Sequence, residues 1–368
     1  MESPDLFMEQ ALAQARRAVG LSEPNPRVGC VIASAGGQVL GEGHTQRAGE
    51  AHAEIMALRD AASRGSNVKG ATAYVTLEPC SHQGRTGPCC DALAAAGIGK
   101  VVAALQDPNP LVAGRGLERL RAAGIEVHLG AGASASRELN IGFFSRMVRR
   151  VPWLRMKLAA SLDGRTALEN GASQWITSEA ARADGHRWRS RAGALLTGIG
   201  TVLQDNPRLD VRHVPCARQP DAVVVDSRLE TPPDAHIFVP GRRLFIYTAL
   251  DGSPQRALLE ARGATVIAMP GPGGKVDLAA MLRDLAQREV NELHVEAGHK
   301  LNGSLLREGL VDELLVYLAP KLLGLGQGMA HLGPLTDLGD AVSLEFQSSQ
   351  SVGPDLRLLA RIPGRDRF

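Results

Sequence analysis

Four residues between positions 52 and 89 have the types and the order that zinc chemistry on water needs. His52 and Glu54 form an H-x-E pair, and Cys80 and Cys89 follow further along the chain. One imidazole and two thiolates fill three positions of a tetrahedral zinc ion, which leaves the fourth for a water molecule whose pKa the metal lowers toward neutrality. Glu54 then remains available for proton transfer. These residues predict one catalytic zinc ion (Zn2+) per chain.

The spacing of the two cysteines is unusual for such a motif. Zinc deaminases carry H-x-E followed by P-C-x-x-C, in which the glutamate is the acid/base and not a ligand. His52 to Glu54 and Pro79-Cys80 match that pattern, but eight residues, Ser81 to Pro88, stand where the usual motif has two. The residue types therefore predict hydrolytic deamination. The longer spacing between the cysteines predicts a deaminase family whose motif carries such an insert.

A structural zinc site, or cysteines without a metal, are the alternatives. A structural site normally has four protein ligands, and His82 and Cys90 are near enough in sequence to supply the fourth. The predicted elements favour the catalytic site, because helices over 52–62 and 89–96 both begin at a ligand and a strand over 70–77 ends just before the third. A helix start also favours the thiolate form of Cys89.

Composition points to a soluble enzyme with more than one domain. The chain has 368 residues and 44% hydrophobic content, enough for two cores. Its formal net charge of +2 gives no broad basic surface for nucleic acid. Five cysteines, an odd number, do not suggest a disulfide framework. We therefore expect a cytoplasmic protein, with no signal peptide, no membrane span and no nucleic-acid partner.

Strand and helix patterns alternate along the whole chain, which predicts an α/β protein. A helix over 133–147 leads into the basic, proline-containing stretch Arg149 to Pro152, so we place domains at 1–147 and 153–368 with a linker at 148–152. Strands are expected at 28–33, 38–41, 101–105 and 126–129 in the first domain. In the second they are expected at 154–159, 194–197, 221–226, 243–248, 265–268, 292–296 and 313–318.

Two glycine turns in the second domain follow predicted strands. Residues 197–201 read TGIGT, and residues 293–298 read LHVEAG before a predicted helix over 301–307. Such turns aim backbone amides at an anion, but neither is the full G-x-G-x-x-G fingerprint, so a Rossmann dinucleotide fold is not supported. The spacing of these glycines alone favours ordinary turns, so it does not predict the function of this domain.

Several segments together resemble the bifunctional deaminase/reductase of riboflavin biosynthesis. The resemblance runs from the first helix to about Pro354, and the insert SHQGRTGP between the cysteines belongs to that family's pattern. The segments are PNPRVGCVI (24–32), HAE (52–54), TLEPCSHQGRTGPCC (76–90), QDPNPLVAGRG (106–116), MKLAASLDGRTA (156–167), SQWIT (173–177), VVVDS (223–227), VEAG (295–298) and LVDELLVYLAPKLLG (310–324).

The resemblance implies two consecutive reactions in two domains. A cytidine-deaminase-like α/β/α domain would hydrolyse an amino group of the pyrimidine ribotide 2,5-diamino-6-ribosylamino-4(3H)-pyrimidinone 5′-phosphate. A dihydrofolate-reductase-like α/β domain would then use NADPH to reduce the ribosyl to a ribityl side chain. Zinc and NADPH are the implied cofactors, and the family pattern leaves a homo-oligomer open.

Carried over to this sequence, the resemblance makes His52, Cys80 and Cys89 the zinc ligands and Glu54 the proton shuttle. It places NADPH contacts at Ala159, Trp175, Thr201, Asp205, Ser227, Gly298, His299, Lys300, Leu301, Asn302, Gly303 and Ser304. It places substrate contacts at Ser173, Arg189, Leu209, Arg212 and Glu296.

The resemblance implies three further substrate contacts, Asn25, Lys157 and Asp163, and two of the residues already named also have a chemical rationale. The guanidinium groups of Arg189 and Arg212 suit the 5′-phosphate, with surface salt bridges as the alternative. Asn25 is expected to hydrogen-bond the pyrimidine or only to form a turn. Lys157 and Asp163 flank the expected sugar site as polar contacts.

Three rival interpretations remain at this point. One is a stand-alone nucleoside deaminase with an unrelated appended domain, which would not bind NADPH. Another is a tRNA deaminase, which would need a basic groove. The third is a zinc-binding scaffold with a filled fourth ligand position, which would release no ammonia. Cys30, Cys90 and Cys216 are expected to be structural.

Overall fold

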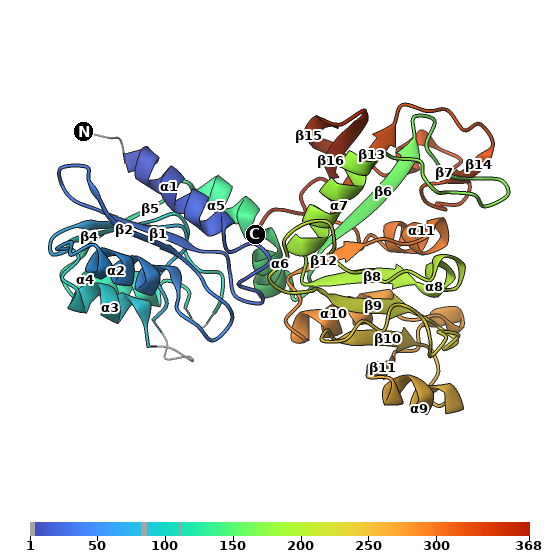
Figure 1. The fold of residues 1–368 in the computed structure, drawn as a ribbon, viewed down its shortest axis with the longest axis horizontal. Coiled ribbons are helices and arrows are strands. Elements are labelled where there is room, and N and C mark those ends of the chain that lie inside the picture. The colour runs from blue at the N-terminus through green and yellow to red at the C-terminus, as the bar shows by residue number, and fades with distance from the viewer. Residues whose placement is uncertain (1–3, 82–86, 111) are drawn as a thin grey trace. The chain divides into compact units, whose positions relative to one another are not determined.

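The computed structural model describes residues 4–81, 87–110 and 112–368. The chain divides into two units, Met1–Arg149 together with Phe368, and Arg150–Arg367. Each unit is built around its own β-sheet (Figure 1). None of the described helices has both the length and the apolar composition needed to span a bilayer.

The sheet of the first unit has five strands in the order β2-β1-β3-β4-β5. Strand β1 pairs antiparallel with β2 and β3, and β3, β4 and β5 run parallel. The strands are β1 (Gly29–Ala33), β2 (Val39–His44), β3 (Thr72–Val75), β4 (Lys100–Ala103) and β5 (Glu126–Leu129).

Alternating side chains of β1 explain why this sheet is covered on both faces. Cys30 and Ile32 belong to the core shared with the helices on one face, and Val31 and Ala33 to the core shared with the first helix on the other. Figure 1 shows the resulting α/β/α layers. Helices α2 (Ala53–Ser63), α3 (Cys89–Ala95) and α4 (Arg115–Ala122) lie on one face, and α1 (Pro4–Arg16) and α5 (Ala133–Leu139) on the other.

Glycine in β2 lets α2 pack directly on the sheet. A Cβ atom at Gly43 would lie 2.5 Å from Cβ of Met56 and 2.7 Å from the carbonyl oxygen of Ala53, both in α2. Only glycine avoids that overlap. The start of α2, which immediately follows His52, is therefore fixed against the sheet.

The single helix predicted over 133–147 is wrong, because the chain forms two helices there. Helix α5 ends at Leu139 and α6 (Ile141–Arg149) begins two residues later. Asn140 stands between them, and its side chain accepts a hydrogen bond from Arg27 N at 2.7 Å and donates one to Arg27 O at 3.0 Å. Because α6 continues to Arg149, the first two residues of the predicted linker are helical.

The second unit contains a nine-stranded mixed sheet in the order β11-β10-β9-β8-β12-β6-β13-β16-β15. The first seven strands in that order run parallel, and β16 and β15 complete the sheet antiparallel. They are β6 (Trp153–Ser161), β8 (Ala194–Gly198), β9 (Asp221–Val225), β10 (Leu244–Thr248), β11 (Ala264–Ala268), β12 (Glu292–Val295), β13 (Glu313–Ala319), β15 (Glu345–Val352) and β16 (Asp355–Arg361).

Four strands were missed by the sequence analysis. They are β15 and β16 together with the small ribbon of β7 (Arg165–Leu168) and β14 (Gly326–Gly328). Strand β15 reads EFQSSQSV and is exposed along most of its length. It lacks the apolar alternation by which a half-buried strand is recognised.

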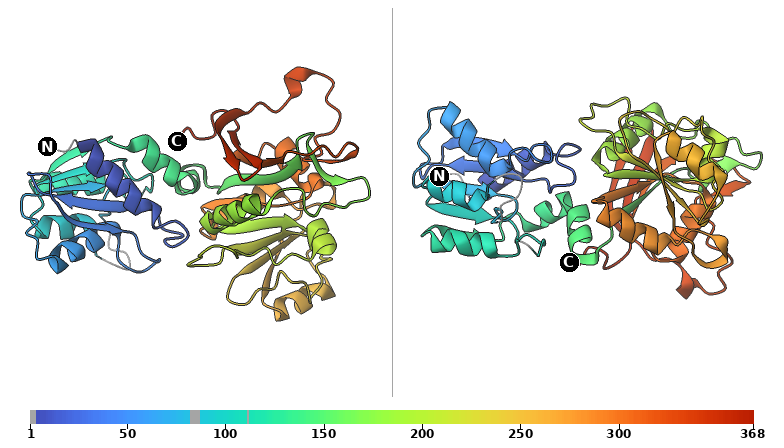
Figure 2. Two further views of the ribbon diagram at one scale, coloured as in Figure 1. Left: turned by 45° about the horizontal axis from the view of Figure 1, so that its top comes forward. Right: turned by 90° about the horizontal axis from the view of Figure 1, so that it is seen from below.

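Helices cover both faces of the second sheet (Figure 2). Leu293 and Val295 of β12 lie in the core that includes α10 (Leu278–Gln287) and α11 (His299–Arg307), whereas Glu292 and His294 point to the opposite face. That opposite face carries α7 (Glu179–Arg191), α8 (Ile199–Asp205) and α9 (Pro254–Ala261).

Parallel strands bring distant segments to one edge of this sheet. The carboxyl ends of β6, β8, β9 and β12 lie along the same edge, where ligands commonly bind in open α/β sheets. Helix α8 follows β8 there, Ser227 follows β9, and Glu296 and α11 follow β12.

Candidate functional site

The three predicted zinc ligands meet at one point of the first unit. Nδ1 of His52 lies 3.5 Å from Sγ of Cys80 and 3.4 Å from Sγ of Cys89. Tetrahedral zinc with bonds of about 2.0 Å to nitrogen and about 2.3 Å to sulfur requires an N···S separation of about 3.5 Å. The three residues are the one group of this kind among the described residues, and their geometry fits zinc.

Secondary structure places each of these ligands. His52 caps the start of α2, Cys80 follows β3 by five residues, and Cys89 is the first residue of α3. The amide of Cys89 donates to Sγ of Cys80 at 3.4 Å. The hydrogen bond from the Cys89 thiol and the contact with His52 lower the pKa of Cys80, which favours the thiolate form that a zinc ligand needs.

Glu54 lies in the first turn of α2 beside these sulfurs. Its side chain is buried, with 3% of the residue surface exposed. Burial, and then the charge on Cys80, raise the pKa of Glu54 to about 7. The structure thus places a carboxyl group next to the ligand cluster in a site with little water, as proton transfer requires.

Glu78 is a buried residue to which the sequence analysis gave no role. Its carboxylate accepts backbone hydrogen bonds from Asp107 (3.1 Å), Gly114 (2.9 Å), Gly116 (2.8 Å) and Leu117 (3.3 Å). Glu78 therefore fixes the loop after β4 against the turn that carries Cys80. The position of Glu78 in the segment TLEPC, two residues before Cys80, was the only sign in the sequence that it has a role. Its hydrogen-bond partners lie 29 or more residues away, so the sequence could not show what that role is.

The loop and this turn approach each other closely. A Cβ atom at Gly116 would lie 2.0 Å from the carbonyl oxygen of Pro79. No other residue could be accommodated at position 116 without moving one of the two segments. The position of Cys80 therefore depends on this contact as well as on Glu78.

Cys90, one of the two residues considered as a fourth zinc ligand, has other surroundings. Cys90 is buried in the core of the first unit, with its sulfur 3.7 Å from Oδ1 of Asp91. His82 lies outside the described residues. Cys30 is also buried, and the Cys216 thiol donates to Arg218 O at 2.8 Å.

Asn25 forms a turn and keeps its side-chain amide available. Its backbone N–H donates to Ser22 O at 2.8 Å, and Oγ of Ser22 donates to Asn25 O at 3.1 Å. The Asn25 side chain makes no hydrogen bond to another described residue. The geometry is compatible with both expectations for this residue.

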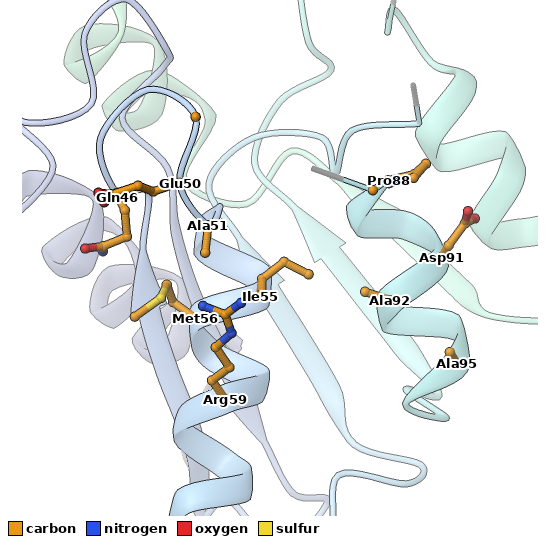
Figure 3. Close-up of a pocket in the computed structure, with 12 residues that line it drawn as sticks. Gln46, Glu50, Ala51, Ile55, Met56, Arg59, Pro88, Asp91, Ala92 and Ala95 are labelled. Atoms are coloured by element: carbon orange, nitrogen blue, oxygen red, sulfur yellow. The ribbon is translucent and has the colours of Figure 1, made fainter. Parts of the chain in front are cut away.

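A hollow of about 960 Å³ lies between α2 and α3. Ile55 of α2 and Ala92 of α3 point toward each other across it (Figure 3). Ala51 and Pro88, which precede His52 and Cys89, also line it, but none of the ligands and not Glu54 does. Among the described residues, the hollow is therefore lined by neighbours of the candidate ligands and not by the ligands themselves.

In the second unit, Arg189, Lys157 and His294, from three different elements, converge on Glu296. Arg189 of α7 donates from Nε to Oε1 at 2.5 Å and from Nη2 to Oε2 at 2.9 Å. Lys157 Nζ lies 3.6 Å from Oε2, and Nε2 of His294 lies 3.3 Å from Oε1. Although Glu296 is buried, Arg189 and then Lys157 hold its pKa well below the usual value, so the carboxylate is charged.

Arg212, the second expected phosphate contact, lies with Leu209 on an irregular segment that Arg189 contacts through Asp210 O. Arg212 pairs with Oδ1 of Asp210 at 2.5 Å, and its backbone N–H donates to Nδ1 of His186 at 3.3 Å. Its side chain is 47% exposed. Leu209, by contrast, has a left-handed φ of 46° and a side chain buried in the core, and its carbonyl oxygen accepts a hydrogen bond from Nη1 of Arg242.

The predicted NADPH contacts gather mainly at the carboxyl edge of the sheet. Oγ1 of Thr201 lies 4.0 Å from the position of a Cβ atom at Gly298, and a Cβ atom at Gly198 would lie 3.1 Å from Leu301. The starts of α8 and α11 are therefore adjacent. Asp205 is at the end of α8, Ser227 follows β9, Ala159 is near the end of β6, and His299, Lys300, Leu301, Asn302, Gly303 and Ser304 belong to α11.

Asn302 and Gly303 fix the position of α11, whereas Gly298 leaves open space at its start. A Cβ atom at Gly303 would lie 2.0 Å from His331 O, whereas one at Gly298 would find only Thr201 within 4 Å. Asn302 donates to Ala297 O and Met329 O at 3.1 Å each. Gly303 and Asn302 thus hold the helix in place, and Gly298 leaves open space at its N-terminus.

The remaining predicted residues lie around the β7 ribbon. Trp175 is 64% exposed, with the Arg182 guanidinium 4.5 Å from its ring centroid, and Ser173 is two residues before it. Asp163 accepts from Ser161 Oγ at 2.5 Å and from the amides of Leu323 and Gly324. The Ser161 hydroxyl and these amides lower the pKa of Asp163 to about 2, which suits a carboxylate that holds a turn.

Both units match known protein families. Residues 1–105 match the cytidine and deoxycytidylate deaminase zinc-binding region, and residues 152–358 match the RibD C-terminal domain. The chain is 46% identical to the riboflavin biosynthesis protein RibD of Escherichia coli, covering 96% of this chain and 98% of that protein. It is 39% identical to that of Aquifex aeolicus, covering 95% and 96%.

Solved structures show the same arrangement of secondary structure. Acinetobacter baumannii RibD has a TM-score of 0.88 and 39% identity, over 97% of this chain and 98% of that one. A diaminohydroxyphosphoribosylaminopyrimidine deaminase/5-amino-6-(5-phosphoribosylamino)uracil reductase from Thermotoga maritima has a TM-score of 0.86 and 30% identity, over 97% and 98%.

These matches favour the bifunctional enzyme over the rival interpretations, because the matching proteins share the second unit as well as the first. A deaminase with an unrelated appended domain would not match the RibD C-terminal domain over residues 152–358. The chain therefore belongs to the RibD family of bifunctional enzymes of riboflavin biosynthesis, with a deaminase domain followed by a reductase domain.

Proposed function

We propose that His52, Cys80 and Cys89 hold one catalytic zinc ion and that Glu54 moves the protons of the deamination. The observation that carries this proposal is the pair of N···S distances, 3.5 and 3.4 Å, beside a buried carboxyl group. Three protein ligands, which leave the fourth position of the metal for water, are typical of a catalytic rather than a structural zinc site.

The proposed substrate of this domain is 2,5-diamino-6-ribosylamino-4(3H)-pyrimidinone 5′-phosphate. Its support is the family membership and the activity for which the Thermotoga maritima relative is named. The Asn25 amide is a candidate contact to the pyrimidine ring because no described side chain occupies it. The reaction replaces a ring amino group with a carbonyl oxygen from water and releases ammonia.

When bound, zinc supplies a water molecule of lowered pKa as the nucleophile. Glu54 accepts one proton of the water and gives it to the ring nitrogen, and then accepts the second proton, from the new hydroxyl group, and gives it to the leaving amine. Its burial next to the ligands keeps bulk water from competing for these protons. Glu78 keeps the turn at Cys80 in place while this happens.

We propose that the reductase domain binds NADPH at the carboxyl edge of its sheet. The open space at Gly298, at the N-terminus of α11, fits a phosphate group, which backbone amides at a helix start would bind. Thr201, Asp205, Ser227, Ala159, Trp175 and residues 298–304 are the proposed contacts. NADPH supplies a hydride to the ribosyl carbon, and the protein orients the two reactants.

The ribosyl phosphate is proposed to lie between Glu296 and Arg212. Glu296 is a charged acceptor for sugar hydroxyl groups, and Lys157 lies beside it with 23% of its side chain exposed. The exposed fork of Arg212 suits the 5′-phosphate. Ser173, Arg189, Leu209 and Asp163 complete the set proposed around this substrate.

The assignment of activities to chain segments is likewise proposed, with deamination in 1–147, a connection at 148–152 and reduction in 153–368. We also propose a cytoplasmic enzyme that acts on a small molecule and needs no nucleic acid or membrane. The test is to incubate the purified protein with the diaminopyrimidinone ribotide with and without NADPH, following ammonia and cofactor absorbance. Ammonia release in both samples, with NADPH oxidation after it, supports the proposal. Ammonia release without any NADPH oxidation contradicts it.

A further inference from the structure

Residues 208–212, the segment that carries Arg212, have no secondary structure and lie between α8 and β9. In the described part of the chain, no backbone group of this segment pairs with another backbone group. Leu209 also has a left-handed φ of 46°, a conformation that leucine rarely adopts. Since backbone N–H and C=O groups need partners, other groups must hold the segment in its shape.

Side chains from outside the segment bind the backbone of all five residues. There are four such side chains, two from α7, one from the chain before β9 and one from the chain before β10. They are Arg242 on the carbonyl oxygens of Arg208 and Leu209 (2.5 Å each), Arg189 on that of Asp210 (2.9 Å), Gln219 on the N–H and the carbonyl oxygen of Val211 (2.8 Å each), and His186 on the N–H of Arg212 (3.3 Å). The shape of the segment therefore depends on these four side chains.

Arg242 holds two neighbouring carbonyl groups at once and is itself anchored in the core. Its Nη1 donates to Leu209 O, and its Nη2 donates both to Arg208 O and, at 2.9 Å, to Ile237 O. Ile237 is fully buried among the apolar residues of this face. The planar guanidinium, with several donors in a fixed fork, thus ties residues 208 and 209 to a rigid part of the unit.

The side chain of Arg212 depends in turn on the residue that follows Leu209. Asp210 accepts from Nη1 of Arg212 on Oδ1 at 2.5 Å and from Nε of Arg208 on Oδ2 at 2.9 Å. The carboxylate therefore sets where both guanidinium groups lie. A shift of the backbone at Leu209 would move Asp210 and, through it, Arg212.

We propose that Arg242 is a positioning residue of the reductase site, which fixes the backbone of residues 208–212 so that Arg212 meets the 5′-phosphate of the substrate. Without Arg242, two carbonyl groups lose their partner and the segment adopts other shapes. Phosphate binding must then also order the segment, which weakens it. This inference rests on the proposed contact between Arg212 and the 5′-phosphate.

The test is the NADPH-dependent reduction of supplied deaminated ribotide by Arg242→Gln, whose amide cannot reach all three carbonyl groups. We expect the KM for the ribotide to rise roughly tenfold or more, as is typical for the loss of hydrogen bonds from a charged group. The value of kcat should stay close to that of the parent protein. With the dephosphorylated riboside as substrate, kcat/KM should change little, because no phosphate is present for Arg212 to bind.

Arg243→Gln is the matched control, since it makes the same change of charge one residue further along. Arg243 pairs with Asp221 at 2.6 Å and makes no hydrogen bond to residues 208–212. Its KM for the ribotide should equal that of the parent. A parent-like KM in Arg242→Gln, or equal losses with ribotide and riboside, would overturn the proposal. A parent-like KM in Arg212→Gln would instead count against the proposed phosphate contact.

Arg242→Lys separates positioning from a general effect on stability. Lysine keeps the charge but has no fork, so its KM for the ribotide should lie between those of the parent and Arg242→Gln. Melting temperatures, followed by tryptophan fluorescence, show whether each variant is folded at the assay temperature. If Arg242→Gln does not fold, the lysine variant decides, and an unchanged KM for the ribotide in folded Arg242→Lys would overturn the proposal.

Discussion

Arg189 and Glu296 form a bidentate ion pair across 107 residues of sequence, with distances of 2.5 and 2.9 Å between their paired atoms. Arg189 also donates from Nη1 to Asp210 O at 2.9 Å. Both side chains are 15% exposed. The guanidinium that suggested a phosphate contact in the sequence therefore has a carboxylate as its partner, which leaves Arg212 as the more accessible fork for the 5′-phosphate.

Glu296→Gln should reduce turnover of the reductase step roughly tenfold or more while leaving NADPH affinity unchanged. The amide removes the negative charge that Arg189 and Lys157 surround, so both cations lose their shared partner. Steady-state kinetics and NADPH titration by fluorescence separate the two effects. Glu345→Gln on the exposed strand β15 is the control. A weaker NADPH affinity with normal turnover would show that Glu296 serves the cofactor.

Gly298→Val should affect NADPH binding, whereas Gly303→Val should affect the stability of the fold. At Gly298 the backbone has a φ of −73° and open space, so valine should fold normally and raise the apparent Michaelis constant for NADPH. At Gly303 a Cβ atom would collide with His331 O, so valine should lower the melting temperature of the reductase domain. Unchanged NADPH affinity in a folded Gly298→Val protein would place the cofactor elsewhere.

Glu78→Gln should destabilise the deaminase domain and weaken zinc retention. The new amide keeps one acceptor oxygen but turns its NH2 group toward two of the four backbone donors that now share the carboxylate, a loss of roughly 2 kcal/mol. Thermal unfolding and competition with a chelator measure the two effects. Glu118→Gln, in the exposed first turn of α4, removes the same charge nearby and should change neither. If Glu78→Gln retained zinc as well as the parent protein, Glu78 would not be needed to hold the turn that carries Cys80.

His186 should make the reductase domain less stable in mild acid. Burial, and then the charge of Arg189, lower the pKa of His186 from 6.5 to about 4. Between these values the unfolded chain binds more protons than the folded one, so stability is complete above pH 6.5 and is lost as the pH falls toward 4. His186→Gln, which keeps an acceptor for the Arg212 amide, should reduce this loss.

Tryptophan fluorescence suits that measurement, because Trp153, Trp175 and Trp188 all belong to the second unit. Urea unfolding at pH 7 and pH 5 in the full chain gives the pH dependence for parent and variant. The difference between the two pH values should be smaller in His186→Gln. Equal differences would mean that other groups carry the acid sensitivity.

The clustering of His52, Cys80 and Cys89 could be predicted from sequence because these residues lie in recognisable local patterns at helix starts and a strand end. His52 and Cys89 stand where periodicity places the beginnings of α2 and α3. The parallel strands of the second unit were predicted for a similar reason, since buried strands are continuous apolar runs.

Features that depend on distant partners could not be predicted in this way. The break at Asn140 is fixed by Arg27, 113 residues earlier. The role of Glu78 depends on amides at 107 to 117, and the pairing of Arg189 with Glu296 depends on the packing of α7 over β12. Sequence proximity carries no information about these contacts, so only the folded chain shows them.

The most direct test of two separate active sites is complementation between Glu54→Gln and Glu296→Gln in the full chain. Glu54→Gln should keep zinc by elemental analysis, lose ammonia release by roughly 10²-fold or more, and still reduce supplied deaminated ribotide. Glu296→Gln should release ammonia normally and oxidise little NADPH. A mixture of the two variants, given the diaminopyrimidinone ribotide and NADPH, should recover both ammonia release and NADPH oxidation. Loss of both reactions in either folded variant, or a mixture that oxidises no NADPH after releasing ammonia, would contradict the account.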